Sequence, residues 1–178
     1  MAGRLFDVSV LKSTLGGGAK TDKFTIEFGA PTGNSALNLG ETGAVLCKTA
    51  SFPQMKLGGV EVYAQGRALV VPGETQFDNT WTLDFYQTVD HKLRQMFIEW
   101  LRGIDDFSTN NHTCTPADWM VDAVVYQLGC NGEPTAKYRF FNMFPDTISE
   151  VRVDGSQLNA IQEFSVSFHF SHWLPEAI

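Results

Sequence analysis

A glycine-rich segment near the N-terminus has some features of a phosphate-binding loop. It spans residues 16–21 with the sequence GGGAKT, so a lysine and a threonine follow a run of glycines. A phosphate-binding loop needs one glycine directly before the lysine and another five residues earlier, because its backbone N–H groups surround the phosphate. Ala19 and Thr14 occupy those positions, and a strand pattern follows where a helix is required. The segment is therefore interpreted as a flexible loop.

Three residues of zinc-binding type lie in the second half of the chain, His112, Cys114 and Cys130. A structural zinc ion takes four ligands, usually from cysteine pairs with about two to four intervening residues, and the sequence contains no such pair. Together with Cys47 these cysteines form an odd set at wide spacing. We therefore expect three reduced, buried thiols in an intracellular setting rather than metal ligands or disulfides.

Two pairs of titratable residues have simple structural interpretations. His169 and His172 are three residues apart at the last predicted strand, where such positions point to opposite faces, so one exposed and one packed histidine are expected. Asp105 and Asp106 follow a predicted helix, which is typical of a solvated turn. No Ser, His and Asp can be assigned as a triad from spacing. We predict no catalytic, cofactor-binding or metal-binding residue and no enzymatic activity.

Charge and hydropathy narrow the class of protein. The 178 residues fit one compact domain, and 13 basic against 20 acidic residues give a net charge of −7. Proteins that bind nucleic acid tightly carry basic stripes, whereas this chain has only short basic pairs. Its charge would let DNA pass but would not hold it. The chain has no apolar run of about 18 residues and no signal-peptide core. We expect a soluble protein, made in the cytoplasm, that does not insert into membranes.

The elements that would position these residues are mostly strands. Alternating apolar and polar residues predict strands over 23–28, 45–50, 80–86, 119–128, 137–144, 148–153 and 163–173. A hairpin is predicted over 58–73, with a turn at 64–66. A helical apolar stripe predicts one helix over 88–104, capped by Thr88 or Asp90 and ended by Gly103. Residues 30–43 are predicted to form a loop, and residues 1–22 an N-terminal arm.

Two separated blocks of sequence carry a resemblance to a known family. The first joins CKTASFP at 47–53, the hairpin at 59–71, PGETQFDNTWTL at 72–83 and HKLRQMFIEW at 91–100. The second joins FFNMFPDTIS at 140–149 and QEFSVSFHF at 162–170. In order and spacing these blocks, which cover roughly residues 45–174, resemble the T4-like tail tube family of contractile, myovirus-type bacteriophages.

The resemblance implies a fold and an assembly. The fold is mainly β, a β-sandwich or split barrel of two packed antiparallel sheets, with one flanking helix and a protruding hairpin in a single domain over 1–178. Subunits would close into hexameric rings that stack into a hollow tube inside the virion, through which genomic DNA passes without specific binding. The implied partners are further copies of the chain, the tail sheath protein, baseplate and tail terminator proteins, and the tape-measure protein.

Two sets of residues are predicted to serve that assembly. The hairpin is more apolar than a single small domain can bury, so we expect it to make contacts between rings or subunits. Its predicted contact residues are Val60, Val62, Tyr63, Leu69, Val70 and Val71. Small, polar, lysine-free strand faces are expected to line the channel, because they offer phosphate no counter-charge. These residues are Thr80, Thr82, Asp84, Ser165, Ser167 and His169.

Other functions remain open at this point. The chain could form the tube of a DNA-free injection machine, type VI-like or R-type bacteriocin-like. It could also be a tube-end protein of the baseplate or terminator, which would form rings that do not extend. From a different class, a monomeric β-sandwich could bind a small ligand in its aromatic core, and it would then be a stable monomer with a pocket.

Overall fold

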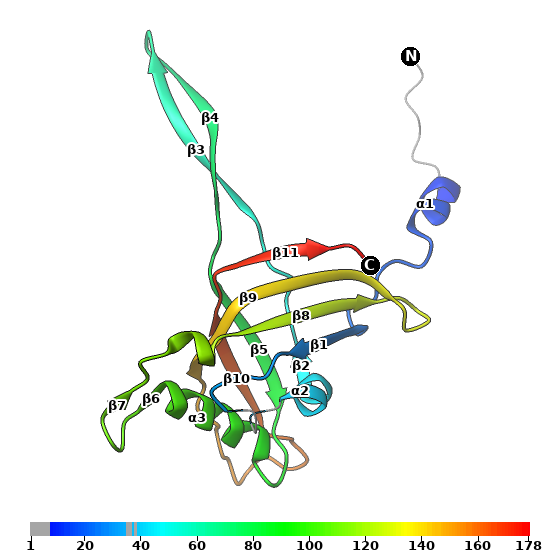
Figure 1. Cartoon of the computed structure of the whole chain (residues 1–178). Helices are drawn as coiled ribbons and strands as arrows, with labels where there is room; N and C mark the ends of the chain where they lie inside the picture. Colours follow the sequence, from blue (N-terminus) through cyan, green and yellow to red (C-terminus); the bar gives the residue numbers. More distant parts are fainter. Residues whose placement is uncertain (1–7, 35–36, 38) are drawn as a thin grey trace.

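A curled antiparallel sheet forms the centre of the computed structural model, which describes residues 8–34, 37 and 39–178 (Figure 1). Its strand order is β1-β8-β9-β10-β5-β2, and β11 pairs with β9 beside this path. The strands are β1 (Phe24–Phe28), β2 (Cys47–Thr49), β5 (Thr80–Tyr86), β8 (Val121–Leu128), β9 (Pro134–Ile148), β10 (Glu163–His169) and β11 (His172–Glu176). Positions 1–7 of the predicted arm, and 35, 36 and 38 of the predicted loop, lie outside the described residues.

The long strand β9 joins two halves of this sheet. Its first part pairs with β8 and β11, and its last part pairs with β10. Between them Asn142 has a positive φ of 53°, a conformation that asparagine tolerates better than most residues. The neighbouring segment also bends at this corner, between β10 and β11. There the Phe170 N–H donates to Asn79 O (3.1 Å) and the Ser171 N–H donates to Phe141 O (3.0 Å). The predicted mainly β fold is confirmed, with its two sheets as halves of one curled sheet.

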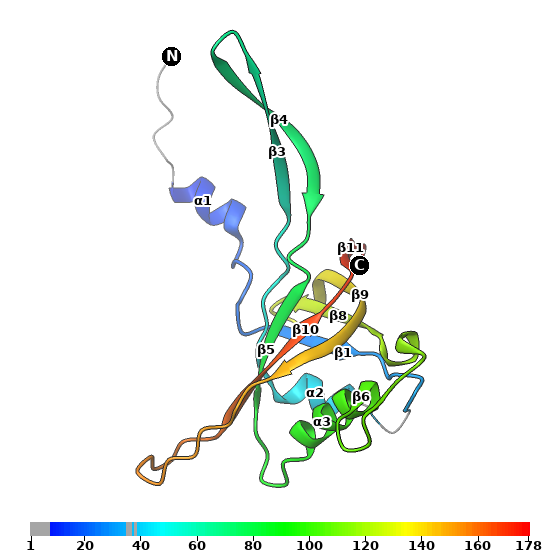
Figure 2. The same cartoon turned by 90° about the vertical axis from the view of Figure 1, so that its left-hand side faces the viewer.

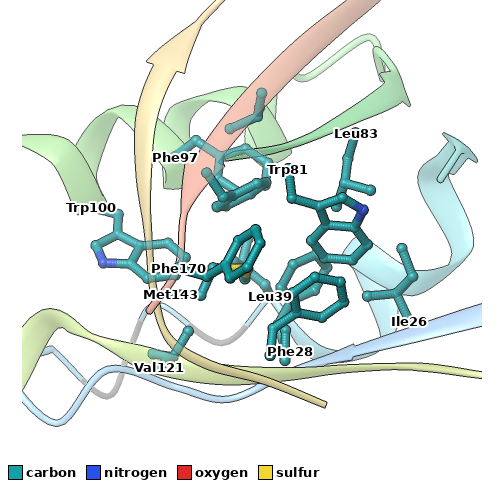
Figure 3. Close-up of a cluster of buried hydrophobic side chains, with 14 of the residues drawn as sticks. Ile26, Phe28, Leu39, Trp81, Leu83, Phe97, Trp100, Val121, Met143 and Phe170 are labelled. Atoms are coloured by element: carbon teal, nitrogen blue, oxygen red, sulfur yellow. The ribbon is translucent and has the colours of Figure 1, made fainter. Parts of the chain in front are cut away.

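An aromatic core fills the space between the half-sheets and helix α3 (Lys92–Ile104), as Figure 3 shows. Trp81 of β5 stacks on Phe140 of β9 with ring centroids 4.2 Å apart. Leu93, Phe97 and Trp100 from the predicted helical stripe are fully buried. Phe97 contacts the rings of Phe85 in β5 and Phe168 in β10, so the helix is part of the core rather than an appendage.

Helix α3 is shorter at its start than the predicted 88–104. It begins at Lys92, after His91 in the left-handed conformation (φ 52°), and the Asp90 carboxylate accepts the Lys92 N–H at 3.4 Å. Near its end, a Cβ on Gly103 would lie 2.1 Å from the Trp119 ring, so only glycine fits there without a shift. Trp119 belongs to the short 3-10 helix η1 (Pro116–Trp119).

Two helices were not predicted. Helix α1 (Val8–Leu15) lies in the predicted arm and has no buried residue, and Gly16 ends it with φ +62° and a 3.2 Å bond from its N–H to Lys12 O. Helix α2 (Gly40–Leu46) replaces part of the predicted loop and the start of the strand predicted over 45–50. Its Gly43 lies against Phe28, where a Cβ would be 3.2 Å from the ring. Tertiary packing therefore explains α2, since its sequence has no helical period.

The later strand boundaries also differ from the prediction. Strand β9 continues through Pro145 and ends at Ile148, so the strand predicted over 137–144 extends to residue 148. The separate strand predicted over 148–153 does not form. Pro145 lies at a register shift against β10, the kind of irregularity at which a sheet accepts proline. The strand predicted over 163–173 divides into β10 and β11 at the corner.

The predicted hairpin consists of β3 (Lys56–Ala64) and β4 (Arg67–Gln76), which form a two-stranded sheet of their own. Gln65 and Gly66 both have positive φ, as the tight turn between two such strands requires. The hairpin projects far beyond the rest of the molecule (Figures 1 and 2). Among the described residues, no helix is long and apolar enough to cross a membrane.

Candidate functional site

The hairpin has one face made mostly of aliphatic side chains, with Arg67 on the same face beside the turn. Val60 lies opposite Val71 and Val62 lies opposite Leu69, and residues directly opposite each other share a face. These side chains remain largely in solvent, with Leu69 64% exposed. Tyr63 and Val70 lie on the other face and are also exposed. The structure therefore brings together all six predicted contact residues on one projecting element.

Tyr63 has a polar partner within the hairpin. Its hydroxyl donates a 2.5 Å hydrogen bond to the Glu61 carboxylate, and this bond raises the pKa of Tyr63. An isolated two-stranded hairpin is at best marginally stable in water, because it has no second layer to cover its apolar side chains. A partner that covered the aliphatic face would therefore stabilise the hairpin.

The six predicted channel residues also share one face, the open side of β5 and β10. Strand register places Asp84 opposite Ser165, Thr82 opposite Ser167, and Thr80 opposite His169. Their neighbours on the other side of the same strands are buried in the core, and these are Trp81, Leu83, Phe85, Phe164, Val166 and Phe168. Strict alternation therefore separates a polar face from an apolar one.

Hydrogen bonds across the strands fix the small side chains of this polar face. The Ser165 hydroxyl donates to the Asp84 carboxylate at 2.6 Å, and the hydroxyl oxygens of Thr82 and Ser167 are 3.0 Å apart. At one end, His169 Nε2 lies 3.5 Å from Asp146 Oδ1. These side chains have partners on the face itself, and the contacts hold them in place.

One lysine reaches the other end of the polar face, which differs from the predicted lysine-free character. Lys48 Nζ lies 2.6 Å from the Glu163 carboxylate and 5.7 Å from the centre of the Tyr86 ring. The hydrogen bond from Lys48 to Glu163 raises the pKa of the lysine. Sequence reasoning missed this residue because β2, which carries it, pairs with β5 only in the folded chain. Its charge is balanced by Glu163.

The residues of zinc-binding type are not brought together as a site. No group of three or more His, Cys, Asp or Glu side chains in the described part of the chain could hold a metal ion. Cys114 and Cys130 are exposed, so their predicted burial is wrong, and both lie in connections between strands. Cys47 is half-buried, and burial raises the pKa of its thiol to about 12.

The histidine and aspartate pairs have local partners. His172 stacks on Phe141 with ring centroids 4.6 Å apart, whereas His169 lies on the open polar face, as expected of one packed and one more exposed histidine. Asp105 and Asp106 form the short strand β6 and pair with β7 (Asn111–His112) instead of the predicted turn. Asp106 accepts hydrogen bonds from Ser108 and Thr109, which lower its pKa.

A second uncovered apolar surface was not predicted. It lies in the connection 149–162 between β9 and β10, where Val153, Leu158 and Ile161 are exposed, and Leu158 reaches 85%. The start of this connection was predicted as a strand, and its glycine and aspartate gave no sign of a contact surface. The only indication in the sequence was the presence of apolar residues in this segment, and they follow no alternation.

Comparison with known proteins gives matches over most of the chain. A family model described as phage tail tube protein matches residues 19–176. The tail tube protein gp19 of Enterobacteria phage T4 is 26% identical over 137 residues, which cover 76% of this chain and 83% of the T4 protein. The family resemblance inferred from the two sequence blocks is thereby confirmed.

Solved structures share the fold at lower identity. The cryo-EM structure of the PVC sheath/tube terminator, from an extracellular contractile injection system, is similar with a TM-score of 0.64 and 15% identity, covering 89% of this chain and 96% of that chain. The PVC sheath-tube complex gives a TM-score of 0.59 at 13% identity, covering 93% and 97%. Identity at this level establishes a common fold only.

Proposed function

This chain belongs to the phage tail tube protein family, and on that premise we propose that it is the subunit of the inner tube of a contractile phage tail. In the proposed assembly, hexameric rings stack into a hollow tube that carries genomic DNA. The observation that carries the proposal is the projecting hairpin, whose aliphatic face the subunit itself leaves uncovered. The proposed unit is one domain over 1–178, with an N-terminal arm.

The hairpin suits a contact that repeats along a tube. A ring needs an interface that closes, and a stack of rings needs a second interface that stays open at its end. Because the hairpin stands away from the curled sheet, it can reach another subunit without disturbing the aromatic core (Figure 2). We assign Val60, Val62, Tyr63, Leu69, Val70 and Val71 to contacts between rings or subunits.

The polar face of β5 and β10 suits the wall of a DNA channel. Each lysine or arginine that contacts a phosphate adds affinity through counterion release, which would hold DNA at every ring. This face carries the carboxylates of Asp84, Asp146 and Glu163 against the single paired Lys48. We assign Thr80, Thr82, Asp84, Ser165, Ser167 and His169 to the channel lining, where hydroxyl and carboxylate groups let the duplex slide.

The proposed role requires no catalysis and no cofactor. The partners would be other copies of the chain, the tail sheath protein, baseplate and terminator proteins, the tape-measure protein and, in transit, double-stranded DNA. Support for the protein partners comes from the fold shared with chains of sheath-tube, baseplate and terminator assemblies. The protein would reside in the virion tail, after assembly in the host cytoplasm.

Negative-stain electron microscopy of the purified protein, with light scattering on the same sample, tests the proposal. We expect rings and long hollow tubes. Because the fold is shared with a terminator chain, a tube-end protein is the second candidate. Rings that never extend, even on purified baseplates, would favour that candidate. A monomer that does not assemble on baseplates and binds a small molecule would refute both.

A further inference from the structure

A β-bulge near the base of the hairpin shifts the pairing of its two strands. Leu57 lies opposite Thr75, and the next pair toward the turn joins Gly59 to Pro72, so two steps along β3 correspond to three along β4. A bulge bends the strand that carries the extra residue and increases the local twist. It separates a short root from an outer hairpin, residues 59–72, which carries the aliphatic face.

Three glycines at this bulge are required for space and not for backbone conformation, since none of them has a positive φ. A Cβ on Gly73 would lie 3.2 Å from Gly58 O, and a Cβ on Gly58 would lie 3.2 Å from Glu74 O. A Cβ on Gly59 would lie 2.9 Å from Val70 Cγ1. Within β3 and β4, Gly58 and Gly73 are also the two residues that are not fully exposed. The two backbones are therefore in direct contact, an approach that glycine permits.

The segments that enter and leave the hairpin are fixed to the body of the molecule. The Trp81 indole N–H donates to Ser51 O at 2.8 Å, and the Gln54 side-chain amide donates to the Asp78 carboxylate at 3.2 Å. Trp81 belongs to the aromatic core. Because the root is held in this way, the direction of the outer hairpin depends on the bulge.

Pro72 restricts the bulge further. Its ring holds φ at about −65°, away from the value of about −140° in a regular antiparallel strand, and it offers no N–H to the ladder. The two strands also wind around each other along the hairpin (Figures 1 and 2). Crowded backbones and a restricted φ leave little freedom at this point, so the bulge acts as a fixed bend and not as a loose hinge.

The length of the outer hairpin makes its direction sensitive to this bend. About six residues per strand, at about 3.4 Å each, place the turn roughly 20 Å from the bulge. A change of about 10° at the bulge would then move the turn by roughly 3.5 Å. A gap of about 1 Å already removes a large part of the van der Waals attraction between two side chains. A small error in the angle would therefore misplace the aliphatic face.

Resting on the tube function proposed above, we infer that Gly58, Gly59 and Gly73 are positioning residues that fix the angle between the outer hairpin and the curled sheet, and thereby the rotation of one ring against the next. They act through the aliphatic face and need not touch a partner themselves. The subunit carries this angle in its own backbone before assembly, so the rotation between rings is set by the free chain.

Distance measurements on the isolated subunit test the fixed bend. One spin label is attached at Ala64→Cys, beside the turn, and the second at one of two native exposed cysteines, Cys130 or Cys114, which lie in different connections. The other of these two cysteines and Cys47 are replaced by alanine. For the unmodified hairpin, pulsed electron paramagnetic resonance should give one narrow distance distribution for each label pair.

Gly73→Val is the variant that should change the bend. Valine is a better strand former than glycine, so any change comes from the lost close approach and not from strand propensity. We expect at least one of the two mean distances to shift by about 3 Å or more, the displacement that corresponds to a change of about 10°. Ala68→Val is the matched control, because it adds a branched side chain at an exposed position of the outer hairpin, and both distances should stay the same.

Electron cryo-microscopy of tubes from the same variants tests the consequence for assembly. Gly73→Val should change the rotation between adjacent rings, and Ala68→Val should not. If Gly73→Val gives no tubes, the milder Gly73→Ala replaces it and should give a smaller change in rotation. Loss of tubes from both glycine variants, with folded subunits and with normal tubes from Ala68→Val, would support the inference.

The opposite results separate the claims. Unchanged distances in Gly73→Val, or a broad distribution in the unmodified subunit, would overturn the fixed bend. Changed distances with an unchanged rotation between rings would overturn the link from bend to rotation. Failure of the unmodified protein to form tubes on baseplates would refute the tube function and that link with it, whereas the distances in the subunit would still decide whether the glycines fix the bend.

Discussion

Replacing Leu69 by aspartate should separate assembly from folding in a single variant. Full burial of a leucine side chain contributes about 1.5–3 kcal/mol. Leu69 is 64% exposed in the subunit, so roughly 1–2 kcal/mol of that burial is still available to an interface. A hexameric ring makes the contact in every subunit, so the apolar loss is about 6–12 kcal/mol per ring junction. Burial of the new charge would add to it.

The change should have little effect on the free energy of unfolding of the isolated subunit. Leu69 belongs to a two-stranded sheet outside the core cluster, and exposed substitutions away from special features usually alter stability by about 0.5 kcal/mol or less. Urea unfolding followed by tryptophan fluorescence measures the stability, and sedimentation with electron microscopy measures assembly. Leu69→Ile serves as the matched control and should form tubes. Tubes of normal length from Leu69→Asp, or a loss of several kcal/mol in the isolated subunit, would refute the reasoning.

Three further predictions concern the core, the thiols and the channel. Gly103→Ala should destabilise the subunit by about 1–3 kcal/mol in urea unfolding, because its Cβ would meet the Trp119 ring at 2.1 Å, whereas Gly155→Ala, with open space around it, should have little effect. At pH 8 a thiol reagent should label the two exposed cysteines but not Cys47, which should react only as the pH rises toward its pKa of about 12. Tubes carrying Ser167→Lys should retain linear duplex DNA at low salt and release it at high salt in co-sedimentation, unlike unmodified tubes.

Alternation made the strands that cover the core easy to predict. Strand β5 occupies 80–86, as its apolar and polar residues indicated, because each buried side chain has a neighbour that must face solvent. The stripe at 93–104 was equally informative, since Leu93, Phe97 and Trp100 reach the core by helical spacing. Where one face of an element is fully buried, the sequence alone indicates the element.

Elements held by packing or by bends were not predictable in the same way. Helix α2 contains two glycines and depends on the close approach of Gly43 to Phe28. Helix α1 has eight residues and no buried side chain, so the helical spacing of Val8, Leu11 and Leu15 was too short to indicate a helix. The corner of the sheet depends on Asn142 and on hydrogen bonds from Phe170 and Ser171 to distant residues, which no local pattern reveals.

The exposed surfaces also differ in how far the sequence predicts them. The hairpin contact residues and the polar face could be named in advance because both follow strand alternation and lie on predicted strands. Lys48 and the exposed apolar residues of the connection 149–162 could not be named in advance. Lys48 joins the polar face through pairing of β2 with β5, and the connection has no regular pattern.

A cryo-electron microscopy reconstruction of the assembled tube tests the central claim most directly. The account predicts hexameric rings in which the side chains of Thr82, Ser165 and Ser167 line the channel and the hairpin reaches the adjacent ring. If that polar face instead lies on the outside of the tube or within a subunit interface, the proposed channel lining is wrong.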